Sequence, residues 1–520
     1  MKGYGPKTRR RARFVWIAGL LVTLSAPEAE GSSSSGPFSE ATELAARLQP
    51  KLALPRAAAA RWGIVVADLH TGQVLFDHNG REPMTPASVT KLLTAAVVLD
   101  RLGSHYRLET VLMLSQSPGP RGILRGPLIV RGQGDPGYGW EGGVENPLRS
   151  FVPLVTLVRQ TGIREVQGGL LAEESYLEST KFGTGWRLDE TVLPYAAPMA
   201  DLNANGNRLR LRVEPGATVG SRCEISLHPG SGGLQVINRT ETVSLGGPHE
   251  IRWSRAPNQP ELTVWGRLPL RGNGWTTEVA VHEPALLFLE LFQQALRQEH
   301  ISITGPLTVR IKSSGIRPDP HSSDVKILGK VYSAPSGALV RQMLKDSRNL
   351  HAAVLLAAVG RWTRSQGRWN GLSLEQAGVH ELRQFLRESG VSVDTVHVEE
   401  AAGLSRSNRL TAQAVVQLLC AMARHREAEM FQEALPVAGV DGTLVNRMRG
   451  TAAQGLLRAK TGTLRGAQGL AGYVQSPQGR SVAFCFFLNQ YVPGSGDPSA
   501  SQLLDRLAVA LAEWAIQTPR

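Results

Sequence analysis

The chain has 520 residues, of which 42% are hydrophobic and 19% are charged, and its formal net charge is +13. This composition excludes a disordered chain, and the length is too great for one hydrophobic core, so two or three domains are expected. The positive charge is spread along the chain, without a patch of interleaved aromatic residues, which argues against nucleic-acid binding. It would favour at most a loose association with anionic wall polymers or membrane surfaces.

The cysteine and histidine residues exclude the commonest metal sites. Cys223, Cys420 and Cys485 are widely spaced, so they form neither a disulfide framework nor a CxxC site. None of the twelve histidines belongs to an HExxH motif, so a zinc hydrolase has no support. We therefore expect no metal and no other cofactor.

The first 26 residues have the pattern of an export signal. Six basic side chains precede an apolar run at residues 14–24, and small residues around Ala26 suit cleavage. A membrane-spanning helix needs about 20 apolar residues, so this run is too short to be a good anchor, although an uncleaved anchor is the alternative. We expect a periplasmic protein with no stable transmembrane segment after cleavage. Residues 27–38, which include a Gly-Ser-Ser-Ser-Ser-Gly run, are expected to be a flexible linker.

Residues 39–105 are predicted to form the first part of the main domain. Arg61–Phe76 reads as a β-hairpin. A helix should follow to about Leu102, with Thr85 as its N-cap and Pro86 at its first position. Ser88 and Lys91 lie three residues apart near the start of this helix, so their side chains should share one face.

This pair suits nucleophilic catalysis. A serine hydroxyl is a weak nucleophile that needs a base, and Lys91 can act as one if burial and a nearby positive charge lower its pKa. Lys460 would supply that positive charge. Taken alone, the spacing is better explained by chance on a core helix.

Residues 106–330 have a different character and are predicted to be one or two inserted, mainly β domains. Short β-like runs alternate with Gly/Pro turns, for example at Asn207–Val213 and Glu261–Leu268, and one helix is expected at Pro284–Arg297. The run Gly132–Gly137 matches G-x-G-x-x-G. A dinucleotide site needs such a loop to open directly into a helix, which Pro136 prevents, so a structural turn is the better interpretation.

Residues 331–520 are predicted to complete the main domain. Ser347 and Asn349 precede an apolar helix at Leu350–Trp362, and two strands and a closing helix are expected near the chain's end. Ser347 and Asn349 should point to the same side of their segment, where the hydroxyl can relay a proton and the amide can hold Lys91 and a substrate carbonyl.

The segment Lys460-Thr461-Gly462-Thr463 is predicted to be a strand lining a cleft. Lys460, Thr461 and Thr463 can bind a terminal carboxylate, and Gly462 should leave space for a substrate backbone. The backbone N–H groups of Thr463 and Ser88 would form an oxyanion hole. An exposed edge strand is the structural alternative.

The order of these segments is more specific than any of them alone. Ser88–Lys91, Ser347–Asn349 and Lys460–Gly462 form the S-x-x-K, S-x-N and K-T-G set of penicillin-recognising serine enzymes. From about Trp62 to Asn489 the chain closely resembles the D-alanyl-D-alanine carboxypeptidase/endopeptidase family (peptidase S13, the class C low-molecular-mass penicillin-binding proteins). Beyond the three motifs, the resemblance rests on Gly134–Pro136, Leu202–Asn205, Gly403–Arg406, Leu435–Leu444, Arg458–Leu464 and Leu470–Tyr473.

The resemblance implies an α/β fold. Its serine β-lactamase/transpeptidase-like domain, an antiparallel sheet flanked by helices, would be interrupted by a large, mainly β insertion of one or two nested domains. It also implies a serine-type DD-peptidase that cleaves D-Ala-D-Ala in peptidoglycan stem peptides, including cross-linked ones, and that is acylated by β-lactams.

Some positions depart from the family pattern. Glu400-Ala401-Ala402-Gly403 stands where the family usually has Asp-Gly-Ser-Gly, and Ala353 replaces a frequent Glu. These departures leave the acyl-transfer groups intact and bear on recognition of the stem-peptide side chain. The candidate residues for that recognition are Glu174 with its neighbour Glu173, Arg406, and Arg465, which replaces a small hydroxylic residue.

Two alternatives remain open. The same three motifs occur in β-lactamases, although the long insertion disfavours that function. The departures could also mark a non-catalytic protein that binds peptidoglycan.

Overall fold

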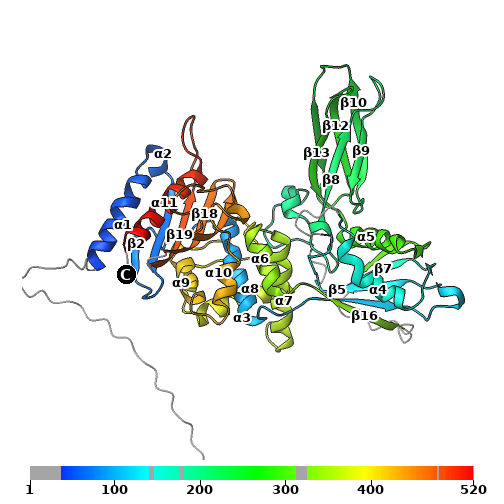
Figure 1. The fold of residues 1–520 in the computed structure, drawn as a ribbon, viewed down its shortest axis with the longest axis horizontal. Helices are drawn as coiled ribbons and strands as arrows, with labels where there is room; N and C mark the ends of the chain where they lie inside the picture. The colour runs from blue at the N-terminus through cyan, green and yellow to red at the C-terminus, as the bar shows by residue number, and fades with distance from the viewer. Residues whose placement is uncertain are drawn as a thin grey trace, which may run out of the picture.

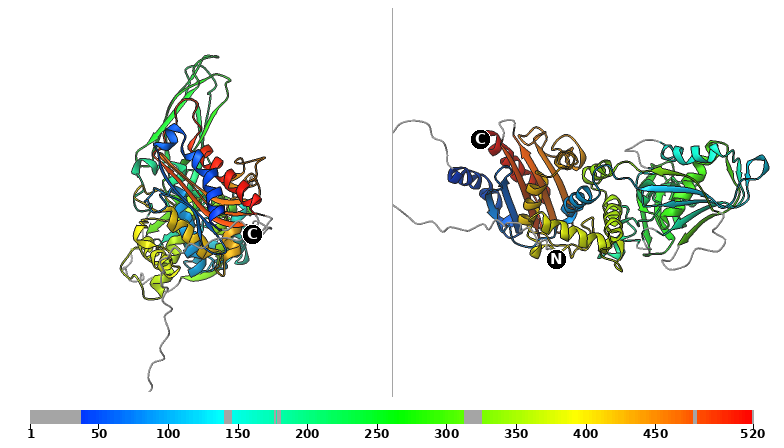
Figure 2. Two further views of the ribbon diagram at one scale, coloured as in Figure 1. Left: turned by 90° about the vertical axis from the view of Figure 1, so that its left-hand side faces the viewer. Right: turned by 90° about the horizontal axis from the view of Figure 1, so that it is seen from below.

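The computed structural model describes residues 37–139, 146–175, 177, 181–311, 325–476 and 480–518. The predicted export signal lies outside these residues, as does the proposed linker up to residue 36. Within the described ranges, no helix has the length and apolar character needed to cross a membrane. The molecule has two lobes side by side, and a β-arm rises from one of them (Figure 1; Figure 2).

One lobe is built around an antiparallel sheet that joins both ends of the chain. Its strand order is β17-β18-β19-β1-β2, so the N-terminal hairpin pairs with the C-terminal strands. Residues of β1 alternate between two cores, with Ile64 and Val66 on one face and Val65 and Ala67 on the other. Both faces are covered, which explains why this strand is apolar throughout. The strands are β1 (Arg61–Asp68), β2 (Val74–His78), β17 (Leu457–Leu464), β18 (Ala467–Gln475) and β19 (Ser481–Asn489).

Helices cover both faces of this sheet. The helices α1 (Pro37–Leu52) and α11 (Ala500–Gln517) pack together on one face, and α9 (Ala412–Met422) packs on the other. A bundle next to α9 carries the first two motifs. It contains α3 (Lys91–Arg101), α6 (Ser336–Lys345), α7 (Asn349–Ser365) and α8 (Leu374–Glu388), while the short helices α2 (Pro55–Ala58) and α10 (Ala428–Glu433) lie at the periphery.

The second lobe is formed by the inserted segment and has its own hydrophobic core. Its main sheet has the order β15-β7-β5-β3-β16, and α4 and α5 pack on it. A small sheet, β14-β6-β4, completes the lobe. The elements are β3 (Glu109–Leu114), β4 (Ile123–Leu124), β5 (Leu128–Gly132), α4 (Val152–Gln160), β6 (Glu165–Val166), β7 (Leu170–Glu174), α5 (Pro284–Gln298), β14 (Ser302–Ile303), β15 (Leu307–Ile311) and β16 (Lys326–Tyr332).

The β-arm is nested inside the inserted lobe. Two three-stranded sheets, β10-β12-β11 and β13-β8-β9, form it, and their buried residues join the core of the inserted lobe. In β8 every second residue is buried, as expected for a strand with one solvent-facing side. The strands are β8 (Arg208–Glu214), β9 (Glu224–His228), β10 (Gln235–Val243), β11 (Glu250–Arg255), β12 (Glu261–Pro269) and β13 (Trp275–Ala280).

The chain between β7 and β8 returns to the first lobe and forms hydrogen bonds with it. Thr184 donates to Glu375, Trp186 donates to Glu400, and the backbone carbonyl of Tyr195 accepts from Asn349. The inserted segment therefore touches the lobe that carries the motifs.

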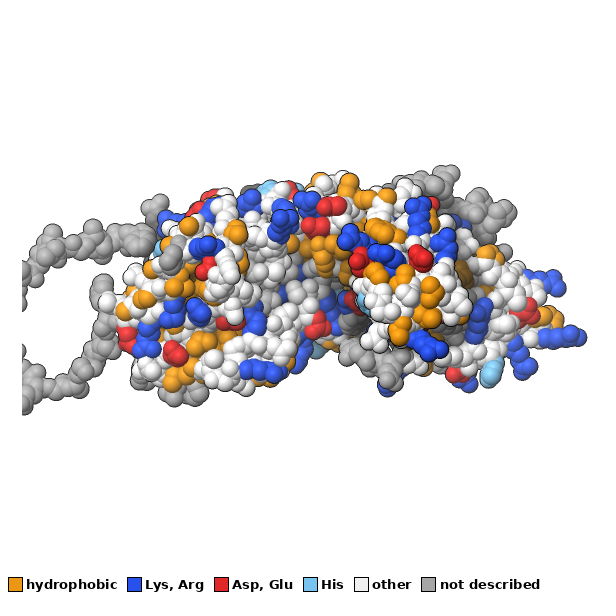
Figure 3. Space-filling view, turned by 90° about the horizontal axis from the view of Figure 1, so that it is seen from above, with side chains coloured by type: hydrophobic (Ala, Val, Ile, Leu, Met, Phe, Trp, Pro, Cys, Tyr) orange, Lys and Arg blue, Asp and Glu red, His pale blue; other side chains and the backbone are white. Residues whose placement is uncertain are grey.

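On the face shown in Figure 3, lysine and arginine side chains are spread over both lobes.

Most predicted elements are present, with one local correction. The hairpin, the helix after Asn349 and the closing strands and helix form as expected, and the Gly132–Gly137 segment is a turn after β5. The prediction of an α-helix capped by Thr85 is wrong. Ala87–Thr90 is instead a 3₁₀-helix (η1) without a side-chain cap, and α3 begins only at Lys91.

Candidate active site

Ser88 and Lys91 lie together despite this correction, because in a 3₁₀-helix side chains three residues apart eclipse each other. The Ser88 Oγ lies 2.9 Å from the Lys91 Nζ. The preceding residue, Ala87, has a φ of 48°, a left-handed conformation that is strained for an alanine. Such strain is common where a fold fixes a reactive side chain.

The contacts of Lys91 orient its nitrogen. Its Nζ lies 2.5 Å from the Asn349 Oδ1 and 2.6 Å from the backbone carbonyl oxygen of Ala402. A neutral amine has two N–H groups and one lone pair. In the ammonium form Lys91 can donate to all three oxygens. In the neutral form the two carbonyl oxygens can engage both N–H groups, which leaves the lone pair for the hydroxyl of Ser88, as a general base requires.

Burial supports the neutral form of this lysine. Lys91 is fully buried, and desolvation lowers its pKa to about 7, against an opposing effect of the negative charge of Glu400. Lys460 is also fully buried. Burial, reinforced by the charge of Lys91, holds the pKa of Lys460 well below its usual value. Two buried amines at one site disfavour simultaneous protonation.

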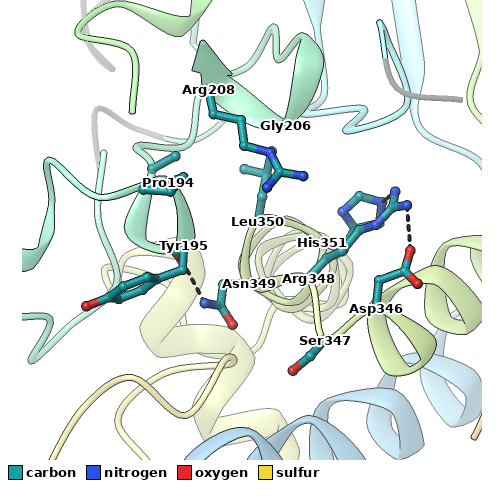
Figure 4. Close-up of a pocket in the computed structure, with 11 residues that line it drawn as sticks. Pro194, Tyr195, Gly206, Arg208, Asp346, Ser347, Arg348, Asn349, Leu350 and His351 are labelled. Carbon is teal, nitrogen blue, oxygen red and sulfur yellow. Dashed lines mark hydrogen bonds and ion pairs between the residues drawn. The ribbon is translucent and has the colours of Figure 1, made fainter. Parts of the chain in front are cut away.

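The S-x-N segment connects these two lysines. The Lys460 Nζ donates to the Ser347 Oγ at 2.9 Å, while Asn349 contacts Lys91. Ser347 has a φ of 58°, and Asn349 is the first residue of α7. Figure 4 shows Ser347 and Asn349 pointing to one side and Arg348 turning away to its ion pair with Asp346. The expectation that the first and third residues face together is confirmed.

The K-T-G segment lies on β17, the edge strand of the sheet. The Thr461 hydroxyl donates to Thr443, and the Thr463 hydroxyl donates to Gln468. A Cβ at Gly462 would lie 2.6 Å from the Pro86 carbonyl oxygen and 3.1 Å from a methyl carbon of Val89. In this structure the glycine therefore allows β17 to pack closely against the segment that carries Ser88.

The residues predicted to recognise the stem-peptide side chain lie apart from the serine and lysine residues described above. Arg406 donates to the backbone carbonyl of Arg465 at 3.2 Å and lies 3.6 Å from Glu190, at the turn between β17 and β18. Glu174 ends β7 in the inserted lobe, where burial and neighbouring acidic groups raise its pKa to about 7. Its neighbour Glu173 is held in ion pairs with Arg131 and Arg310. Within the part of the chain that the structure describes, no hydrogen bond or ion pair joins either glutamate to Ser88, Lys91, Ser347 or Lys460.

A pocket of about 220 Å³ adjoins the S-x-N segment. Its wall has two sides: α7 with the segment before it forms one, and the inserted segment forms the other with Pro194, Tyr195, Ala197, Gly206 and Arg208 (Figure 4). The Asn349 Nδ2 donates to the Tyr195 carbonyl oxygen at 2.7 Å, which fixes the amide so that its oxygen faces Lys91.

Several residues at this site carry no recognisable sequence signal. Ala402 acts through its backbone carbonyl, so its side chain gives no clue. Tyr195 and Trp186 come from the insertion, and Glu400 was visible only as a departure from the family pattern. Across the residues that the structure describes, no group of His, Cys, Asp and Glu side chains could hold a metal ion.

Comparison with known proteins identifies the family of the chain. The family described as D-Ala-D-Ala carboxypeptidase 3 (S13) matches residues 44–512. The chain belongs to this family. The D-alanyl-D-alanine carboxypeptidase of Actinomadura sp. (strain R39) is 32% identical over 518 residues, which cover 98% of this chain and 91% of that protein. The chain is therefore a serine-type D-Ala-D-Ala carboxypeptidase, as the resemblance implied.

Solved structures show the same fold. Penicillin binding protein 4 from Haemophilus influenzae matches with a TM-score of 0.72 at 23% identity, covering 91% of this carboxypeptidase and 98% of that chain. Its complex with a β-lactam matches with a TM-score of 0.67. The predicted fold class, a transpeptidase-like domain interrupted by inserted, mainly β domains, is confirmed.

Proposed function

We propose that this carboxypeptidase is an exported serine DD-peptidase that cleaves the bond between two D-alanines of peptidoglycan stem peptides through an acyl-enzyme on Ser88. The observation that supports it best is the 2.9 Å contact between the Ser88 Oγ and the Lys91 Nζ, with the pKa of Lys91 lowered to about 7. A lysine with that pKa is about half neutral at pH 7, so the base is present near neutral pH.

The acylation step uses both lysine–serine contacts. Ser88 Oγ attacks the carbonyl carbon while Lys91 takes its proton, and the backbone N–H groups of Ser88 and Thr463 hold the developing oxyanion. The C–N bond then breaks as Ser347 relays to the leaving amine the proton that Lys91 took from Ser88, which leaves Lys91 neutral and Ser347 unchanged. Water next attacks the ester, and Lys91 takes the water's proton and returns one to Ser88, which restores the enzyme.

The K-T-G strand would hold the substrate's terminal carboxylate. Lys460, Thr461 and Thr463 are the binding groups in this proposal. A carboxylate beside Lys460 supplies the opposite charge that this buried amine lacks, so its binding would raise the pKa of Lys460 and favour an ion pair. Gly462 keeps β17 close to Ser88 and so keeps the carboxylate site near the nucleophile.

The cellular setting and the wider substrate range belong to the same proposal. The predicted export signal supports a periplasmic location, where stem peptides, including cross-linked ones, would be the substrates. Penicillin would acylate Ser88 because its lactam carbonyl replaces the scissile amide. Arg406, Arg465 and Glu174 are proposed to influence which stem-peptide side chains are accepted.

Steady-state release of D-alanine from a pentapeptide tests this function. A DD-peptidase releases D-alanine and is labelled by a fluorescent penicillin at Ser88, and Ser88→Ala abolishes both. A β-lactamase would instead turn over penicillin rapidly, and a non-catalytic wall-binding protein would do neither. Persistent labelling of Ser88→Ala would refute the assignment of the nucleophile. Intact muropeptide dimers then measure any endopeptidase activity.

A further inference from the structure

Glu400 is a buried carboxylate that anchors the turn next to the catalytic lysine. Its side chain is 1% exposed, yet it is charged and lies on no helix or strand. Burial of an unpaired charge is costly, so a carboxylate in this position requires strong partners. Five N–H groups donate to it, from the backbones of Ala402 (2.7 Å), Gly403 (2.7 Å) and Ser405 (3.3 Å) and from the side chains of Asn408 (2.8 Å) and Trp186 (3.2 Å).

The turn that Glu400 anchors is in direct contact with the catalytic segment. The Ala402 carbonyl oxygen accepts from Lys91, and the Ala401 carbonyl oxygen accepts from Thr94, one turn further along α3. Gly403 has a φ of 85°, and a Cβ there would clash with the carbonyl oxygen of Ala87, the residue before the nucleophile. The position of the Ala402 carbonyl is thus set by Glu400 on one side and by η1 on the other.

Two charged groups face Lys91 from the elements packed around it. Lys460 on β17 is like-charged when both amines are protonated, and Glu400 is of opposite charge. The other close partners, Ser88, Asn349 and the Ala402 carbonyl, are neutral. The charges of Glu400 and Glu399 help to raise the pKa of Glu375, whereas Glu400 is the carboxylate whose charge raises the pKa of Lys91.

We propose that Glu400 is a positioning residue for Lys91 and that Trp186 links it to the inserted lobe. The proposal rests on the proposed function, in which Lys91 is the base. Glu400 has two effects on that base. It holds the Ala402 carbonyl where it engages one N–H of Lys91, so the lone pair faces Ser88. Its negative charge also stabilises the ammonium that forms when Lys91 takes the serine proton in a fully buried site.

A purely structural role makes a different prediction. If Glu400 only accepts hydrogen bonds from the N–H groups of its turn, replacing it lowers the rate of acylation at every pH by the same factor. If its charge acts on Lys91, its loss also lowers the pKa of Lys91. Acylation rises with pH as Lys91 loses its proton, so the midpoint of that rise then moves to lower pH.

The test is the pH profile of single-turnover acylation by a fluorescent penicillin, measured on the full chain. Glu400→Gln keeps one acceptor oxygen and removes the charge, so the midpoint should fall by roughly one pH unit and the plateau rate should also fall. Trp186→Phe removes a donor from the carboxylate and leaves its charge less compensated. Its midpoint should therefore move in the opposite direction, to higher pH.

Glu399→Gln is the matched control. Glu399 is the adjacent residue and accepts from the Ser405 hydroxyl at 2.6 Å, but its charge does not act on Lys91. Its midpoint should coincide with that of the unsubstituted enzyme. Circular dichroism shows whether each variant folds. If Glu400→Gln does not fold, Trp186→Phe alone provides the test.

The outcomes separate this inference from the proposed function. Opposite shifts in Glu400→Gln and Trp186→Phe support the inference. The inference is overturned if the midpoint stays unchanged in both variants while penicillin still labels Ser88. If only Trp186→Phe folds, an unchanged midpoint in that variant overturns it. An unsubstituted enzyme that penicillin does not label at Ser88 overturns the proposed function itself.

Discussion

The Asn349 amide donates to the backbone carbonyl of Tyr195 and turns its oxygen toward Lys91. Tyr195 belongs to the inserted segment, and Asn349 begins α7 in the other lobe. A single side chain therefore connects the inserted lobe to the proposed catalytic base. The insertion supports one wall of the site and does not merely extend from a complete enzyme.

This relationship predicts the effect of Asn349→Asp. The new carboxylate would lie beside Lys91 and would favour its ammonium form, so the pKa of Lys91 should rise. Less neutral base would then be present near pH 7, and the rise of acylation with pH should move to higher pH. The measurement is the penicillin acylation rate from pH 5 to 10.

The control for this substitution is Asn349→Ala, which removes the acceptor without adding charge. It should lower the acylation rate at all pH values, since one N–H of Lys91 loses its partner. A profile for Asn349→Asp that superposes on that of the unsubstituted enzyme would contradict the contact between this side chain and Lys91.

Lys91→Ala tests the base directly. General-base catalysis is typically worth roughly 10²–10⁴-fold, so acylation by penicillin and release of D-alanine should both slow by about that factor. In the unsubstituted enzyme the rate should rise as pH passes through about 7, because Lys91 becomes neutral there. The variant should lose this dependence, and acylation at a near-normal rate would mean that another group is the base.

Gly462→Ala tests how close β17 must lie to the nucleophile. The added Cβ would lie 2.6 Å from the Pro86 carbonyl oxygen, which is backbone and cannot swing aside. Overpacking of this kind typically costs about 1–3 kcal/mol, so the melting temperature should fall and acylation should slow. Thermal unfolding and acylation rates measure the two effects.

Gly466→Ala, in the turn after β17, provides the comparison. A Cβ there has no neighbour within 4 Å, although the φ of 79° makes alanine strained. It should lower stability modestly without slowing acylation. Equal acylation rates in the two glycine variants would show that the close approach of β17 does not matter for the chemistry.

The sequence was sufficient for those parts of the site whose residues are close together along the chain. Ser88 and Lys91 are one turn apart, and Ser347 and Asn349 are two residues apart, so their spacing alone predicts that they face together. The local backbone was less predictable. Thr85 and Pro86 fit an α-helix start, yet the chain forms a 3₁₀-helix there and strains Ala87.

The contacts that tune Lys91 could not be predicted in this way. Ala402 contributes a backbone carbonyl, which every residue possesses, and its position depends on a turn anchored by Glu400. Trp186 and Tyr195 are distant in the sequence and reach the site only because the inserted segment folds back onto the first lobe. Tertiary contacts of this kind leave no periodic or local pattern in the amino-acid sequence.

Arg465→Ser tests whether this arginine reads the side chain of the stem peptide. Arg465 is exposed at the turn between β17 and β18, where a guanidinium repels an ammonium group and attracts a carboxylate. We expect the unsubstituted enzyme to show little preference for a free side-chain amine. The serine variant should cleave amine-bearing peptides faster, while its labelling by penicillin, which lacks that amine, should barely change.

The structure makes this substitution a clean one. Arg406 contacts the backbone carbonyl of Arg465 and not its side chain, so Arg465→Ser leaves that contact in place. The measurement is kcat/KM for a peptide with a free amine and for its acetylated form, in both enzymes. Acetylation removes the charge, so the gain in Arg465→Ser should be confined to the free amine. Equal rates for the two peptides in both enzymes would show that Arg465 does not sense this group.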